Sequence, residues 1–212
     1  MDLDSAKRTK NGVIVHRHSL MDDEIVEHEG VLVTSRLRTL IDLSRVAAFR
    51  DAVVALDNAL ASDVVPLIKE ELLAALEAQG TARGATRAGR AIEFATPLAA
   101  SPGESFSRVL IHELGFPAPE LQHEFRNPMG GRRFADFWWE YLRLIGEFDG
   151  QGKYFDPRYT HGRTPQQVMW DEKQRENELR EQDTGLVRWD WSLLRAPTAF
   201  IRRLEAAGLR RR

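Results

Sequence analysis

Three acidic residues fall on two apolar segments that together are typical of a β-hairpin, and a lysine, Lys153, follows the second segment. The segments are residues 134–139 and 142–149. Their aromatic and β-branched content favours strands over helices. If the turn centres between residues 141 and 142, antiparallel pairing sets Asp136 opposite Glu147. Asp149 then points the same way, because alternate side chains share a face. Carboxylates directly across a strand pair repel each other, so the pattern predicts a compensating partner, of which a bound divalent cation is the simplest.

The chemistry that this hairpin predicts is metal-assisted phosphodiester hydrolysis. Mg²⁺ prefers oxygen ligands at about 2.1 Å and keeps several waters, so one or two carboxylates suffice to bind it or the similar Mn²⁺. Asp136 and Glu147 are the predicted direct ligands. Asp149 completes the shell, and Glu104 reaches the same site from the preceding helix. Lys153 then stabilises developing charge or orients an attacking water. The alternative is that the acids are ordinary solvent-facing strand residues, since isolated charges are usually exposed.

Basic residues flank the acidic hairpin, as a phosphate backbone requires. The predicted contacts to nucleic acid are Arg133, Lys173, Arg175 and Arg188. A solvated, salt-bridged helix is the alternative for the segment around Lys173. A second basic group, on one face of a short predicted helix, comprises Arg83, Arg87 and Arg90. This group either contacts DNA or belongs to a polar linker helix.

Composition limits the class of protein. The 212 residues are enough for one large or two small domains, and 29% charged with 8% aromatic residues favours a globular chain. With a formal net charge of −2, any nucleic-acid surface must be a local patch. There is no cysteine, which excludes disulfides, thiolate metal sites and a cysteine nucleophile. No apolar run approaches the about 18 residues of a membrane span and no signal peptide is evident, so a cytoplasmic protein without a membrane partner is expected.

The elements that must position these residues form two parts. Residues 1–96 are predicted to be a mainly helical module with a small sheet or hairpin. Its helices are predicted from capping residues and apolar spacing at about 35–43, 51–61, 66–79 and 85–94. A linker at 97–103 marks the boundary to a second domain, residues 97–212.

The second part is predicted to be a compact mixed α/β domain. Its expected order is a helix at 104–114, a strand at 121–126, the acidic hairpin, a charged helix at about 164–181, a strand at 185–190 and a last helix ending near residue 209. The hairpin face opposite the acids is a predicted core surface, formed by Ala135, Phe137, Trp139, Leu142, Leu144 and Phe148.

A wider pattern of motifs surrounds the acids. The motifs are Ser101-Pro102-Gly103-Glu104-Ser105, Arg108, Leu114-Gly115-Phe116-Pro117-Ala118-Pro119, Asp136-Phe137, Glu147-Phe148-Asp149-Gly150, Lys153-Tyr154, Glu172-Lys173-Gln174-Arg175-Glu176 and Arg188-Trp189. Their order and spacing over residues 101–195 resemble a bacterial family of uncharacterised domains related to the very-short-patch-repair endonucleases, which belong to the PD-(D/E)XK nuclease superfamily. The resemblance implies a restriction-endonuclease-like fold, a mixed four-stranded sheet flanked by helices, with a divalent-metal centre on the second and third strands.

The same resemblance assigns roles to particular acids. It makes Glu104 the acid of the first helix, Asp136 the aspartate of the second strand and Glu147 the acid of the third-strand motif. The superfamily pattern has lysine two residues after that acid, where this chain has Asp149. Lys153 is the nearest substitute, so the sequence supports metal binding more strongly than catalytic turnover.

The N-terminal part carries a shorter resemblance. Residues 33–43, Val-Thr-Ser-Arg-Leu-Arg-Thr-Leu-Ile-Asp-Leu, are similar to a segment of proteins that resemble the antitoxins of abortive-infection (type IV) toxin–antitoxin systems, in which it often precedes a nuclease-like domain. This implies a protein partner for the N-terminal module. A capped amphipathic helix that packs on the second domain is the alternative.

The leading expectation is therefore a Mg²⁺- or Mn²⁺-dependent endonuclease-like protein that acts on DNA. One rival is a non-catalytic nucleic-acid-binding or antitoxin-like regulator on a degenerate nuclease fold. The other is a structural interaction protein whose acids are solvated.

Overall fold

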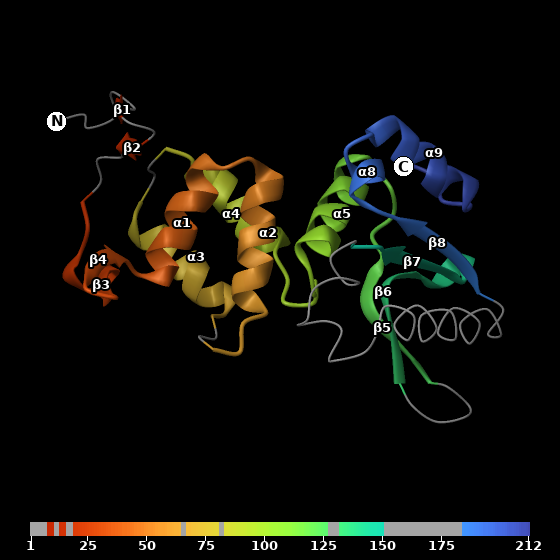
Figure 1. The fold of residues 1–212 in the computed structure, drawn as a ribbon, viewed down its shortest axis with the longest axis horizontal. Helices are drawn as coiled ribbons and strands as arrows, with labels where there is room; N and C mark the ends of the chain where they lie inside the picture. The colour runs from red at the N-terminus through yellow and green to blue at the C-terminus, as the bar shows by residue number, and fades with distance from the viewer. Residues whose placement is uncertain are drawn as a thin grey trace.

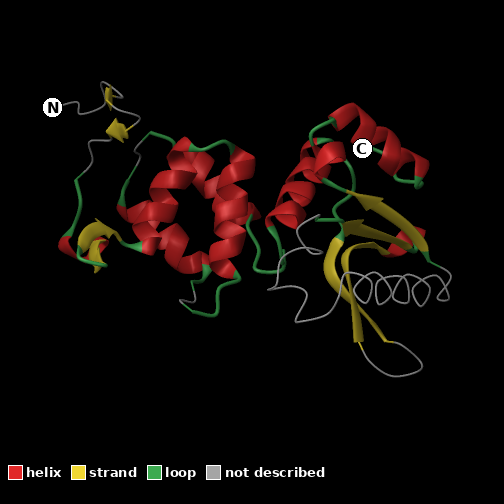
Figure 2. Cartoon of the chain, in the orientation of Figure 1, coloured by secondary structure: helices red, strands yellow, loops and turns green. Residues whose placement is uncertain are grey.

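The structure is a computed structural model that describes residues 8–10, 13–15, 19–64, 67–80, 83–126, 132–150 and 184–212. Two small hairpins and a group of helices come first along the chain, and a four-stranded sheet that is covered by helices on one face follows (Figure 1). The fold class is mixed α/β (Figure 2). None of the helices in these ranges is both long and apolar enough to cross a membrane. The predicted site residues Lys153, Lys173 and Arg175, and the predicted helix at 164–181, lie outside the described residues.

Two separate antiparallel hairpins form near the N-terminus, where the sequence predicts one small sheet or hairpin. Strand β1 (Arg8–Lys10) pairs with β2 (Val13–Val15), and β3 (Ile25–His28) pairs with β4 (Val31–Thr34). A short 3-10 helix, η1 (Asp22–Glu24), precedes β3. The two-residue turn between β3 and β4 has positive φ at Glu29 and Gly30, as the tight turns that match strand twist require.

Four helices then form close to their predicted positions. They are α1 (Arg36–Val46), α2 (Phe49–Leu60), α3 (Lys69–Ala78) and α4 (Ala85–Phe94). The start of α3 lies three residues after the predicted one, because the Glu71 carboxylate accepts a hydrogen bond from the Ile68 backbone and fixes the first turn there. Their shared core is apolar and buried: Leu40, Ile41, Ala52, Val53, Leu56, Ala59, Leu72, Leu76, Ala88, Ala91, Ile92, Ala95 and, from the next helix, Val109.

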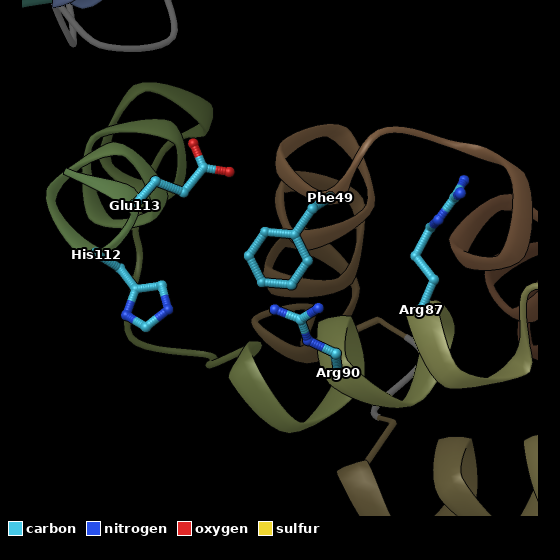
Figure 3. Close-up of a pocket in the computed structure, with 5 residues that line it drawn as sticks. All are labelled: Phe49, Arg87, Arg90, His112 and Glu113. Atoms are coloured by element: carbon cyan, nitrogen blue, oxygen red, sulfur yellow. The ribbon is translucent and has the colours of Figure 1, made fainter. Parts of the chain in front are cut away.

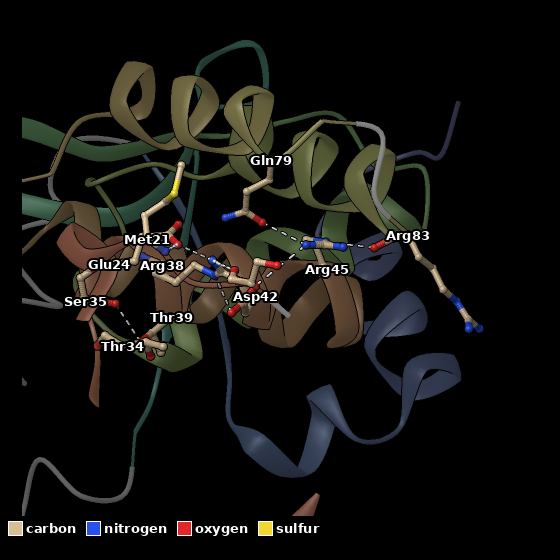
Figure 4. Close-up of polar contacts among 11 residues, drawn as sticks. Met21, Glu24, Thr34, Ser35, Arg38, Thr39, Asp42, Arg45, Gln79 and Arg83 are labelled. Atoms are coloured by element: carbon tan, nitrogen blue, oxygen red, sulfur yellow. Dashed lines mark hydrogen bonds and ion pairs between the residues drawn. The ribbon is translucent and has the colours of Figure 1, made fainter. Parts of the chain in front are cut away.

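Two buried arginines on α1 fasten the surrounding loops to this core (Figure 4). Arg38 donates to Glu24 at 2.6 Å and to Asp42 at 2.8 Å, which ties η1 to the helix. Burial alone lowers the pKa of Arg38, but the hydrogen bonds and charges of these two carboxylates outweigh it and leave the pKa above its ordinary value. Arg45 donates to the Gln79 side chain and to the Arg83 carbonyl, each at 3.0 Å. The chain entering α4 is therefore held against α1.

The second part contains a mixed sheet in the order β5-β6-β7-β8. Its strands are β5 (Glu120–Arg126), β6 (Arg132–Trp139), β7 (Leu144–Phe148) and β8 (Gly185–Trp189), and the 3-10 helix η2 (Glu140–Leu142) joins β6 to β7. Neighbours are antiparallel except β7 and β8, which are parallel. The single last helix of the prediction is two helices, α8 (Trp191–Leu194) and α9 (Pro197–Ala206), because Pro197 cannot continue a preceding helix and starts a new one.

Helices α5 (Pro102–Glu113), α8 and α9 cover one face of this sheet (Figure 1). The core between them includes Leu110, Ile111, Phe116, Phe137, Trp139, Leu144, Phe148, Val187, Trp189, Leu194, Phe200, Leu204 and Leu209, with Leu142 partly buried beside it. This confirms the predicted core face of the hairpin except at Ala135. That residue packs instead with Phe125, Trp138 and Ile145 in a separate cluster. Strand β5 is irregular beside it, since Gln122 has a left-handed φ of 51°.

Candidate functional site

The strand register of β6 and β7 agrees with the predicted placement of Asp136 opposite Glu147. Strands β6 and β7 pair Phe137 with Gly146, Trp138 with Ile145 and Trp139 with Leu144. The same register carried one residue further sets Asp136 opposite Glu147. The backbone ladder ends there, and the Asp136 carboxylate accepts a hydrogen bond of 2.9 Å from the Phe148 backbone N–H.

Both acids are buried, which argues against ordinary solvent-facing carboxylates. The exposed fractions are 9% for Asp136 and 3% for Glu147. Charged side chains are rarely buried to this degree unless their charge is compensated. The two acids of the hairpin are therefore a buried pair, and the alternative of a solvent-facing strand surface does not describe them.

Arg188 supplies part of that compensation. Parallel pairing of β7 with β8 sets Arg188 beside Glu147, and its guanidinium donates to the Glu147 carboxylate at 2.9 Å. Asp136, Glu147 and Arg188 thus follow one another across three adjacent strands. We call this set the acid–arginine row. The sequence predicted that Arg188 contacts nucleic acid, and it did not predict the contact between Arg188 and Glu147.

Glu104 is anchored in the first turn of α5. Its carboxylate accepts hydrogen bonds from the Ala100 backbone at 2.9 Å, the Ser101 hydroxyl at 2.8 Å and the Gln122 side chain at 2.9 Å. Ser101 in turn caps the helix by accepting from the Glu104 backbone N–H. Glu104 therefore has a structural role in the cap, and it reaches the sheet through Gln122.

Gln122 belongs to this neighbourhood but carries no motif signal. It lies on β5 between the pairs Leu121 with Phe137 and His123 with Ala135, hence beside Asp136. Its left-handed backbone interrupts the strand, and its side chain extends to Glu104. The sequence did not predict how β5 pairs with β6. The observed pairing is what places Gln122 beside Asp136.

The approach of α5 to the sheet depends on Gly103. A Cβ built there would lie 1.9 Å from the Phe148 ring, so only glycine lets the helix come this close. One turn later, Ser107 accepts a hydrogen bond of 2.8 Å from the Trp189 indole. These two contacts position the first turn of α5 against the ends of β7 and β8.

The remaining described site residues lie around the row. Asp149 follows β7 directly, and its backbone N–H donates to the Trp189 carbonyl at 2.8 Å. Arg133 is half-buried on β6, opposite Phe125. Asp149 therefore lies at the end of β7, and Arg133 lies on β6 three residues before Asp136. Both are near the predicted centre.

Two of the predicted ligands provide carboxylate oxygens, the ligand type that Mg²⁺ prefers. Over the described part of the chain, no three His, Asp or Glu side chains gather closely enough to hold a metal ion, so Glu104 and Asp149 do not join the acid pair in such a group. Asp136 and Glu147 nevertheless provide two buried carboxylates from facing strand positions. Mg²⁺ keeps several of its waters and needs only one or two carboxylates.

Comparison with known proteins gives two relatives in Mycobacterium tuberculosis. These are proteins of strains CDC 1551 and H37Rv, both described as uncharacterised, and each is 29% identical over 147 residues. The match covers 69% of this chain, and the chain spans 54% of the length of these relatives. No protein-family model matches the chain, and no solved structure matches it significantly.

Proposed function

We propose that the chain is a metal-dependent DNA endonuclease-like protein that hydrolyses phosphodiester bonds, built on a restriction-endonuclease-like core at residues 97–212. The observation that carries the proposal is the acid–arginine row: two buried carboxylates and a guanidinium on adjacent strands of a mixed four-stranded sheet. The resemblance of its motifs to a bacterial family of uncharacterised domains related to the very-short-patch-repair endonucleases supports the same function.

Asp136 and Glu147 would hold the Mg²⁺ or Mn²⁺ ion. When bound, such an ion polarises a phosphoryl oxygen and lowers the pKa of a bound water. The chain's own residues hold the two carboxylates in place: the Phe148 N–H orients Asp136, and Arg188 orients Glu147. Burial reduces the screening of these carboxylates by bulk water, which strengthens their attraction for a divalent cation.

Cations near the row would bind the DNA backbone. Arg133 and Arg188 are the described members of the predicted set, and Lys173 and Arg175 are the members outside the described residues. Arg188 already contacts Glu147, which holds its guanidinium beside the proposed metal ligands. Lys153 is proposed to stabilise charge in the transition state. The helical module at 1–96 is proposed to position DNA or a protein partner.

A second function is favoured by one specific observation. The 2.9 Å contact between Arg188 and Glu147 is an internal substitute for a bound cation. On that basis, the alternative is a non-catalytic nucleic-acid-binding or antitoxin-like regulator that keeps the fold.

A plasmid-nicking assay with Mg²⁺ or Mn²⁺ separates the two. The native chain is expected to nick the plasmid, and Asp136→Asn and Glu147→Gln are each expected to reduce the rate about 100-fold or more, the scale of losing a preorganised charge. Glu140→Gln is the matched control, because Glu140 is an exposed acid in the turn of the same hairpin. DNA binding by the native chain without any metal-dependent cleavage would reject the enzyme and favour the regulator.

A further inference from the structure

A basic groove lies away from the acid–arginine row, where α2, α4 and α5 meet. It has a volume of about 450 Å³ and is lined by Phe49, Arg87, Arg90, His112 and Glu113. Figure 3 shows the Arg90 guanidinium beside the Phe49 ring, with His112 and Glu113 projecting from α5 on one side. Arg87 projects from α4 on the other side of the ring. The proposed nuclease-like centre uses none of these residues.

The charge of the groove is positive because its one carboxylate already has a partner. The Arg50 guanidinium donates to Glu113 at 2.6 Å. Arg87 and Arg90 therefore face the groove as two cations in excess of that ion pair, and both are exposed. Arg87 makes one long contact of 3.5 Å, to the Ala47 carbonyl at the end of α1, which engages one of its five donors.

The apolar wall adds a second recognition element. Phe49 lies 5.9 Å from the Arg90 guanidinium and 5.5 Å from the Phe94 ring, and Phe94 lies 4.9 Å from the His112 ring. These contacts fix the positions of the groove's aromatic residues. Guanidinium groups next to an aromatic ring suit a ligand that combines a phosphate with a flat or apolar group.

The size of the groove sets an upper bound on that ligand. Small-molecule sites usually measure about 300 to 1,000 Å³, so this groove accommodates one nucleotide unit. We propose that it binds a nucleotide unit through its phosphate, held by Arg87 and Arg90. The unit belongs either to a nucleic-acid strand or to a free mononucleotide. This site is independent of phosphodiester hydrolysis and of any metal at the acid–arginine row.

The test is a binding titration in EDTA, which removes any contribution from a metal centre. The probes are a fluorescein-labelled 12-nucleotide single-stranded DNA, with AMP and inorganic phosphate as competitors. The Arg87→Gln/Arg90→Gln variant is expected to weaken DNA binding at least about tenfold and to reduce the slope of log affinity against log salt by about 1. Competition by AMP identifies a free nucleotide as a ligand, and its absence identifies the nucleic-acid strand.

The control is Arg195→Gln/Arg202→Gln, which removes the same charge from two exposed arginines outside the groove. Its affinity is expected to stay within about twofold of the native value, and unchanged circular dichroism establishes that both variants are folded. Equal losses in the two variants, or no loss in the Arg87/Arg90 variant, would overturn the proposed site.

Discussion

The acid pair shows how one sheet accommodates two buried like charges. Asp136 accepts from a backbone N–H at the point where its strand stops pairing, and Glu147 lies against the guanidinium of the neighbouring strand. Each charge thus has a partner from a different strand. A divalent cation and Arg188 would therefore share the task of balancing Glu147.

Replacing Arg188 by leucine tests whether Arg188 and a divalent cation both balance the charge of Glu147. The change removes a guanidinium from the buried Glu147 carboxylate, so we expect a loss of about 2 kcal/mol in the free energy of unfolding, measured by urea denaturation. Mg²⁺ is then expected to restore part of the loss by binding the folded state. The double variant Arg188→Leu/Glu147→Leu should regain stability without responding to Mg²⁺. An identical Mg²⁺ response in both variants would exclude Glu147 as a ligand.

Local sequence predicts that Asp136 faces Glu147, but it does not predict the contact between Glu147 and Arg188. The register of Asp136 and Glu147 follows from a short hairpin, because the turn position and the alternation of side chains fix it. Arg188 comes from a parallel strand 41 residues after Glu147, and no local pattern sets the register of parallel neighbours across such a separation. Gln122 was missed for a related reason: its left-handed backbone leaves no periodic signal.

At the scale of elements, a single aspartate ends β8 and begins α8. Asp190 follows Trp189 directly, and its carboxylate accepts hydrogen bonds from Ser192 and from the Leu193 backbone. The pKa of Asp190 lies below its ordinary value. The hydrogen bond from the Ser192 hydroxyl is the largest cause, and the hydrogen bond from the Leu193 backbone N–H is the next. The short helix α8 thus depends on a charged cap, and it carries the buried Leu194 into the core.

Acid should therefore weaken this cap. A carboxyl with a lowered pKa in the folded state stabilises the fold above its unfolded pKa of about 3.9, and the contribution is lost as pH falls through the folded-state pKa. Asp190→Ala is expected to lose about 1 kcal/mol in urea unfolding at pH 7 and distinctly less at pH 2.5. Asp63→Ala, at an exposed loop acid, serves as control. A loss for Asp190→Ala that is the same at both pH values would contradict the charged cap.

Element boundaries were predictable where capping and apolar spacing agree. Helix α4 has its predicted bounds because Gly84, with a φ of 85°, precedes it and its apolar residues recur at helical spacing. A larger residue at this glycine would also press on the Arg45 carbonyl, 2.3 Å from the added Cβ. The break between α8 and α9 was missed, although Pro197 marks it, because a continuous apolar spacing runs through both helices.

For the molecule as a whole, α5 is shared between two hydrophobic cores. Val109 packs with the core of α1 to α4, whereas Leu110 and Ile111 pack in the core between α5 and the four-stranded sheet. Between these contacts, Arg108 donates to both oxygens of the fully buried Asp57 at 3.0 and 2.9 Å. Among the described residues, α5 and its buried ion pair with Asp57 thus link the helical module to the sheet.

That ion pair should decide how firmly the two cores are joined. Arg108→Met leaves Asp57 buried without its guanidinium partner, so we expect a loss of about 3 kcal/mol in the free energy of unfolding, measured by urea denaturation. The matched control is Arg50→Met, which breaks a partly exposed pair with Glu113 and should cost less than about 1 kcal/mol. If coupling through α5 is as strong as the shared core implies, the native chain unfolds in one transition and Arg108→Met broadens it or splits it in two. Equal costs for the two variants would show that Arg108 contributes no more than a surface contact.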